Sequence, residues 1–201
     1  MNALQNVAVM AARRGGSILL RHLNRLDKLR VEKKGHNDFV SDADRAAEAA
    51  VIEVIHKHYP DHAILAEESG ARGESDTVWI IDPLDGTQAF VNDMPGFSVS
   101  IALVARDAAP LLGVVYNPVD QVLYRAIRQQ GAFRDGEPMM LPKLDHRQPL
   151  TLRTDFSFQQ HPWLAVTEHG LTEIADHLGL SGSKIEFRTG GVINACGVLE
   201  N

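Results

Sequence analysis

The chain has 201 residues, of which 44% are apolar and 23% are charged, a composition that is typical of a soluble globular protein and excludes bulk disorder. Its formal net charge of −6 argues against a general nucleic-acid binder, which needs a basic face toward phosphate groups. The single cysteine, Cys196, excludes an intrachain disulfide and a cysteine-based zinc site.

The N-terminal part of the sequence predicts two helices. Apolar residues at helical spacing indicate an amphipathic helix over the first two dozen residues and a second helix over about 42–58. Residues 28–33 are predicted to form a short strand between them. Arg13 and Arg14 interrupt the early apolar pattern, so we expect neither a signal peptide nor a membrane span, and a reducing cytoplasm is the expected location.

The middle of the chain is rich in predicted strands. Ala63–Ala66 is a short apolar run that leads into Glu67, and Val78–Ile81 is a second one that leads into Asp82. Residues 70–76 are expected to form a polar loop between these two runs. Four further strands are expected at 97–104, 112–116, 122–125 and 131–133.

The C-terminal part predicts a second α/β unit. Residues 134–149 contain three prolines and are expected to connect two lobes, after which a helix is expected at about 162–178 and a strand at 184–187. Two helices, a mainly antiparallel sheet and a further α/β unit together indicate a layered α+β fold.

Acidic residues follow both apolar runs of the predicted sheet. If these two strands lie side by side in parallel, Glu67 and Asp82 emerge at one edge of the sheet, and Asp85 follows in a turn that Pro83 stiffens. Two unit charges about 4 Å apart repel by ~4 kcal/mol at an effective dielectric constant near 20. Protons or cations would offset this repulsion, and a set of oxygen ligands favours Mg²⁺, Mn²⁺ or Ca²⁺ over zinc.

Gly86 and Thr87 add anion-binding potential to this turn. Glycine lets the backbone approach an anion closely, and exposed N–H groups there can bind phosphate oxygens. Two alternatives remain open: Asp-Pro-x-Asp-Gly is also a good turn sequence, and Asp44 also fits a helix-capping box. The haloacid-dehalogenase type of phosphatase is disfavoured, because its two acids are separated by one residue and Asp82 and Asp85 by two.

Over most of residues 1–135 the sequence resembles the inositol monophosphatase superfamily, because several spaced motifs occur in the family's order. The matching segments are 38–44 (DFVSDAD), 66–70 (AEESG), 79–87 (WIIDPLDGT), 98–102 (SVSIA) and 113–118 (GVVYNP). The resemblance implies an αβαβα sandwich of the sugar-phosphatase type. It divides the chain into a metal- and phosphate-binding lobe, 1–140, and the start of a second lobe, 141–201.

The resemblance also implies the ligands of a Mg²⁺ site with two or three ions. Glu67, Asp82, Asp85 and the backbone carbonyl of Leu84 match the family's metal ligands, and Asp82 would bridge two metals. Glu67 is in addition expected to act in catalysis.

The remaining implied roles concern phosphate and water. Gly86 and Thr87 would donate backbone N–H groups to the phosphate, and Thr87 and Asp44 would orient the attacking water. Lys33 or Lys34, together with Asp38, would support the site. The metals would lower the pKa of a water that attacks in line, without a covalent phosphoenzyme.

The function implied is Mg²⁺-dependent, lithium-sensitive hydrolysis of a small phosphate monoester. Inositol monophosphate is the first expected substrate and a 3′(2′),5′-bisphosphate nucleotide is the alternative. No nucleic-acid or membrane partner is expected, and a homodimer is allowed.

The sequence departs from the family in one respect. The family's C-terminal Trp-Asp motif, which completes the second metal site, is not found in these 201 residues. We therefore expect a truncated chain with an incomplete second lobe. The alternative of another class is a non-catalytic binding or regulatory protein that has lost the second metal site.

Overall fold

The computed structural model describes residues 2–29, 36–140, 145–154, 162, 164–187 and 191–197. The helices in these ranges are α1 (Asn2–Leu29), α2 (His36–His58), α3 (Thr87–Val91), α4 (Leu164–His177) and α5 (Gly191–Gly197). The strands are β1 (Ala63–Ala66), β2 (Gly70–Arg72), β3 (Thr77–Asp85), β4 (Ser98–Ala105), β5 (Pro110–Asn117), β6 (Val122–Ile127), β7 (Gly131–Arg134), β8 (Glu137–Met139), β9 (Leu150–Thr154) and β10 (Ser183–Phe187). The order of elements confirms the predicted α+β class.

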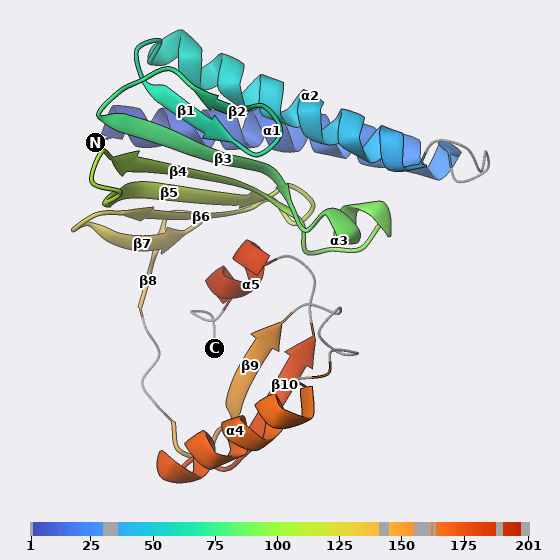
Figure 1. Cartoon of the computed structure of the whole chain (residues 1–201), viewed down its shortest axis with the longest axis vertical. Helices are drawn as coiled ribbons and strands as arrows, with labels where there is room; N and C mark the ends of the chain where they lie inside the picture. The colour runs from blue at the N-terminus through green and yellow to red at the C-terminus, as the bar shows by residue number, and fades with distance from the viewer. Residues whose placement is uncertain are drawn as a thin grey trace.

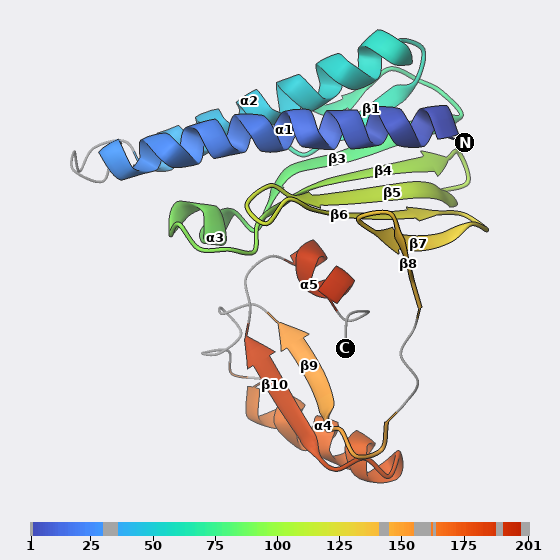
Figure 2. The ribbon, with the colours of Figure 1, turned by 180° about the vertical axis from the view of Figure 1, so that it is seen from behind.

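Eight strands form one sheet in the order β2-β1-β3-β4-β5-β6-β7-β8. Strands β1 and β3 pair in parallel, and every other neighbouring pair in this sheet is antiparallel. Helices α1 and α2 cover one face of the sheet side by side, as both views show (Figures 1 and 2). The opposite face looks toward the C-terminal elements.

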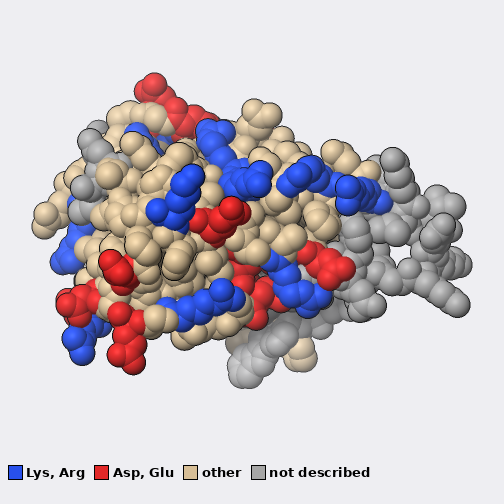
Figure 3. Space-filling model, turned by 90° about the horizontal axis from the view of Figure 1, so that it is seen from above, with Lys and Arg blue, Asp and Glu red and all other residues tan. Residues whose placement is uncertain are grey.

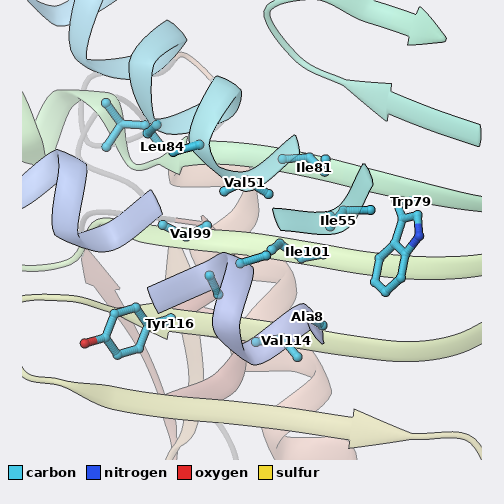
Figure 4. Packing of buried hydrophobic residues seen from close by; sticks show 14 of the residues in the cluster. Ala8, Val51, Ile55, Trp79, Ile81, Leu84, Val99, Ile101, Val114 and Tyr116 are labelled. Atoms are coloured by element: carbon cyan, nitrogen blue, oxygen red, sulfur yellow. The ribbon is translucent and has the colours of Figure 1, made fainter. Parts of the chain in front are cut away.

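The hydrophobic core lies between the two helices and the sheet (Figure 4). Trp79, Ile81, Val99 and Ile101 project from the central strands and are at most 2% exposed. Small residues on α1 allow a close approach, since a Cβ atom added at Gly15 would lie only 2.8 Å from Val51 Cγ2. This packing holds the ends of β1, β3 and α2 in fixed positions relative to one another.

An aromatic cluster borders the core near the first residues of β3. The Trp79 indole N–H donates a hydrogen bond to His62 Nδ1 over 3.1 Å, and the Tyr59 and His62 rings stack with their centroids 4.8 Å apart. Burial lowers the pKa of His62, with an opposing contribution from Asp61. The neutral imidazole is therefore the form that the folded chain favours.

We expect protonation of His62 to weaken this cluster. Because the folded pKa of His62 lies below the unfolded value, its contribution to stability is complete above about pH 6.5 and falls as the pH drops toward the folded pKa. The emission of Trp79, recorded in a Trp163→Phe background, should change over this pH range. The change should disappear in His62→Gln, which can still accept the hydrogen bond but does not titrate.

A second, smaller sheet pairs β9 and β10 in parallel, with α4 in the connection between them. Helix α5 lies between this unit and the large sheet (Figures 1 and 2). The predicted helix at 162–178 and strand at 184–187 are confirmed as α4 and β10 with small shifts of their ends. Strand β9 was not predicted.

Three details differ from the sequence-based expectations. The strand expected at 28–33 is wrong for its first two residues, because α1 continues to Leu29, and the rest of that segment lies outside the described residues. The expected loop at 70–76 contains the short edge strand β2, and the expected connection at 134–149 contains β8. Both strands have three residues and gain their hydrogen bonds from one neighbour only. None of the described helices is long and apolar enough to span a membrane.

Candidate metal and phosphate site

The parallel pairing of β1 and β3 brings the two predicted acids together. Ala66 is the register partner of Ile81, so Glu67 and Asp82 leave neighbouring strands at the same level. The Glu67 N–H extends this pairing by donating to the Ile81 carbonyl over 3.1 Å. The expectation that both carboxylates meet at one edge of the sheet is confirmed.

The charge of Asp82 is strongly disfavoured in this position. Burial raises the pKa of Asp82 to about 7, and the neighbouring Glu67 charge, a hydrogen bond with the Glu67 carboxyl and the Asp85 charge all act in the same direction. The Leu84 N–H opposes this shift by donating to Asp82 Oδ1 over 3.1 Å. The carboxyl groups of Asp82 and Glu67 are thus placed to share one proton, and a cation could take the place of that proton.

The turn after Asp82 is fixed by its own hydrogen bonds. The Thr87 hydroxyl donates to the Leu84 carbonyl over 3.2 Å. Gly86 has a φ of 88° in the left-handed region, where a side chain is disfavoured, and α3 begins directly after it at Thr87. The first N–H groups of this helical turn have no acceptor within the turn, and the family resemblance assigns those of Gly86 and Thr87 to a phosphate.

Asp85 is turned toward the C-terminal unit. A register irregularity between Asp82 and Asp85 interrupts the pairing of β3 with β4 and reorients the strand. The Ser98 hydroxyl donates to Asp85 Oδ2 over 3.3 Å, the Gly191 N–H donates to Oδ1 over 3.2 Å, and the Val192 N–H donates to Oδ2 over 3.0 Å. Asp85 therefore connects the large sheet to the start of α5.

Two further acids reach the site from α2. Asp44 is 7% exposed, its Oδ1 has no hydrogen-bond partner among the described residues, and burial together with the charges of Glu68, Glu67 and Glu48 raises its pKa to about 7. Glu48 is 3% exposed and accepts a hydrogen bond from the Glu68 N–H over 2.7 Å. These contacts place α2 against the end of β1.

The carboxylate oxygens of the site are ligands of the kind that a hard cation prefers, although in this arrangement the described acids are not close enough together to form a complete ligand set. Among the described residues, no three His, Cys, Asp or Glu side chains are placed to hold a metal ion together. Asp82 and Glu67 meet, whereas the carboxylate of Asp85 is engaged by α5. Two pKa values near 7 and a buried Asp44 oxygen without a partner nevertheless mark an electrostatic cost that Mg²⁺ could offset with oxygen ligands. On this chemistry the residues fit Mg²⁺.

The other predicted residues are placed as follows. Lys33 and Lys34 lie outside the described residues, and Asp38 lies in the first turn of α2. Ser98 and Glu48 were not among the residues predicted for the site. Glu48 could have been predicted from the sequence, because it follows Asp44 by four residues on the same helix and lies beside apolar residues of the buried side.

Comparisons with known proteins concern the family and the fold of the chain. A sequence model of the inositol monophosphatase family matches residues 1–177. Nus factor SuhB of Haemophilus influenzae is 42% identical over 162 residues, which are 80% of this chain and 60% of that protein. The chain therefore spans about three fifths of the length of this relative.

Solved structures show the same fold. The extragenic suppressor protein SuhB of Bartonella henselae is similar with a TM-score of 0.77 and 32% identity, over 98% of this chain and 74% of that one. Inositol monophosphatase from Anabaena is similar with a TM-score of 0.73 and 29% identity, over 98% of this chain and 72% of that one. On the match over residues 1–177, the chain belongs to the inositol monophosphatase family.

Proposed function

We propose that this chain takes part in the Mg²⁺-dependent hydrolysis of a small phosphate monoester, with inositol monophosphate as the first expected substrate. The observation that carries the proposal is the meeting of Glu67 and Asp82 at the end of the parallel strand pair, beside a turn whose N–H groups can bind phosphate. The family supports this type of reaction.

In this proposal Glu67, Asp82, Asp85 and the Leu84 carbonyl would hold Mg²⁺. The bound cation would neutralise phosphate charge and acidify water. Among the described residues, the Leu84 carbonyl already accepts the Thr87 O–H, and its second lone pair stays usable.

The protein groups would position the phosphate and the water. The N–H groups of Gly86 and Thr87 would donate to phosphate oxygens. Because the Thr87 hydroxyl proton is donated to Leu84, its oxygen is left to accept a hydrogen bond from water. Asp44, whose pKa is raised to about 7, is suited to exchange a proton near neutral pH.

The test is phosphate release from a substrate panel with and without Mg²⁺. The panel contains inositol monophosphate and a 3′(2′),5′-bisphosphate nucleotide, which is the alternative substrate. The relative from Haemophilus influenzae carries the name Nus factor rather than that of a phosphatase, so a non-catalytic role is the alternative of another class. Saturable Mg²⁺ binding without phosphate release from any substrate would support that alternative, and no Mg²⁺ response at all would contradict the metal site.

Mg²⁺ is expected to stabilise the fold more at pH 8 than at pH 5.5. The folded pKa values of Asp44 and Asp82 are raised to about 7, so without metal their contribution to stability is complete below the unfolded value of 3.8 and is lost as the pH rises through 7. A bound cation would offset the negative charges of the deprotonated carboxylates, so the stabilisation by Mg²⁺ grows as Asp44 and Asp82 lose their protons. At ten times the dissociation constant the gain is about 1.4 kcal/mol, or a melting temperature higher by a few degrees, as thermal unfolding would show.

A further inference from the structure

We propose that Glu48 is a positioning residue of this site: its carboxylate fixes the backbone that carries Glu67 and thereby sets how Glu67 faces Asp82. The inference rests on the proposed function, because it concerns a residue that would act on the Mg²⁺ ligands rather than touch the substrate. It is carried by hydrogen bonds and burial.

The Glu48 carboxylate is buried, and burial of a charged group normally lowers the stability of a fold. Its side chain is 3% exposed in the middle of α2, and among the described residues no Lys, Arg or His forms an ion pair with it. A buried carboxylate without a cation is strongly disfavoured unless hydrogen bonds stabilise it. The contact that the structure provides is the Glu68 N–H, which donates to Glu48 Oε2 over 2.7 Å.

This contact completes a double attachment of the Glu67 backbone. On one side, the Glu67 N–H donates to the carbonyl of Ile81, the residue directly before Asp82. On the other side, the Glu68 N–H donates to Glu48. The two peptide groups that flank the Glu67 Cα atom are thus held by β3 and by α2. Loss of the second attachment would leave the chain free to rotate just after Glu67.

The same helix also carries Asp44, one turn before Glu48. Residues four apart lie on one face of a helix, so Asp44 and Glu48 are neighbours, and the Glu48 charge contributes to the raised pKa of Asp44. The repulsion between Asp44 and Glu48 lowers the stability of the fold, so stability does not explain why both acids are present. The Glu48–Glu68 hydrogen bond relates the helix of Asp44 to the backbone of Glu67, and the Glu67–Ile81 bond relates that backbone to Asp82.

Two variants separate positioning from simple stability. Glu48→Gln keeps a hydrogen-bond acceptor of the same length, and Glu48→Met keeps the length without a comparable acceptor. Glu53→Met is the matched control, because Glu53 is an exposed residue of the same helix that lines the same groove as Glu48. For each variant of the 201-residue chain, the Mg²⁺ midpoint is measured by thermal shift and by phosphate release, and exchange of the Glu68 amide hydrogen is measured without Mg²⁺.

We expect Glu48→Met to raise the Mg²⁺ midpoint about tenfold or more, as removal of groups that orient metal ligands does elsewhere. Glu48→Gln should change it less than about threefold and Glu53→Met not at all, a pattern that a purely structural effect of Glu48 would not produce. Exchange of the Glu68 amide should become faster in Glu48→Met and stay slow in Glu48→Gln.

An unchanged Mg²⁺ midpoint in Glu48→Met would overturn the proposal, as would equal shifts in the Gln and Met variants, which would assign the effect to charge. If the unaltered chain shows no Mg²⁺ response, the proposed function fails instead. Amide exchange then decides independently whether Glu48 holds the Glu67 backbone, and equal protection of Glu68 in all variants would show that it does not.

Discussion

Replacement of Asp82 by asparagine is expected to lower Mg²⁺-dependent phosphate release by at least about a thousandfold. Metal ions contribute several kcal/mol to the stabilisation of charge in such reactions, and each 1.36 kcal/mol corresponds to a factor of ten in rate. Asp82 is the acid that meets Glu67 directly, and asparagine would remove the charge that we propose binds the cation. Initial rates at saturating Mg²⁺ measure the effect.

The same substitution should stabilise the fold in the absence of Mg²⁺. Above pH 7 the half-buried Asp82 carboxylate lies beside the Glu67 and Asp85 charges, and asparagine removes this repulsion while its side-chain oxygen can still accept from the Leu84 N–H. A higher melting temperature in metal-free buffer at pH 8, combined with the loss of Mg²⁺ stabilisation, would support the assignment. Full activity in Asp82→Asn would show that the site has been placed on the wrong residue.

The elements around Glu67 and Asp82 could be predicted because their signals are local. The apolar runs 63–66 and 78–81 are short, rich in Ile, Val and Ala, and end in acids, which is typical of buried strands that lead to a site. Their parallel pairing was a condition of the prediction, and the structure supplies it: the register of Ala66 with Ile81 brings the acids level.

Strand β9 could not be predicted in the same way, because its stability comes from distant residues. The run LTLRT alternates weakly, and its five residues pair with 183–187, more than thirty positions later in the chain. Helix α5 is similar, because its first N–H groups donate hydrogen bonds to Asp85, which lies 106 positions before Gly191 in the chain. Such long-range partners leave no pattern within the segment itself.

Net charge was also a coarse guide to the surface. The chain carries −6 overall, yet Arg13, Arg14, Arg21 and Arg25 are all exposed on α1. Figure 3 shows Lys and Arg side chains in a row across the face of the two helices, with Asp and Glu side chains beside them. The negative total charge therefore describes the molecule as a whole and does not describe this face (Figure 3).

Replacement of Asp85 by alanine is expected to impair both the metal site and the attachment of α5. Phosphate release should fall by at least about a hundredfold, since the substitution removes a proposed cation ligand. The N–H groups of Gly191 and Val192 would lose their acceptor, and hydrogen bonds of this kind contribute roughly 1 kcal/mol each. Amide exchange at these two residues should accelerate about fivefold or more. Ser98→Ala is the control, because it removes only one donor to Asp85.

Asparagine at the same position separates the two roles. A carboxylate offers about four lone-pair positions, and the described contacts from Ser98, Gly191 and Val192 use three of them. One position is left, so we expect Mg²⁺ to bind Asp85 without displacing α5, and exchange at Gly191 to change less than twofold on addition of Mg²⁺. Asp85→Asn retains one oxygen and should keep part of the protection while losing activity. If Mg²⁺ instead accelerates exchange at Gly191 in the unaltered chain, cation and helix compete for Asp85, and metal binding must then loosen the attachment between the two sheets.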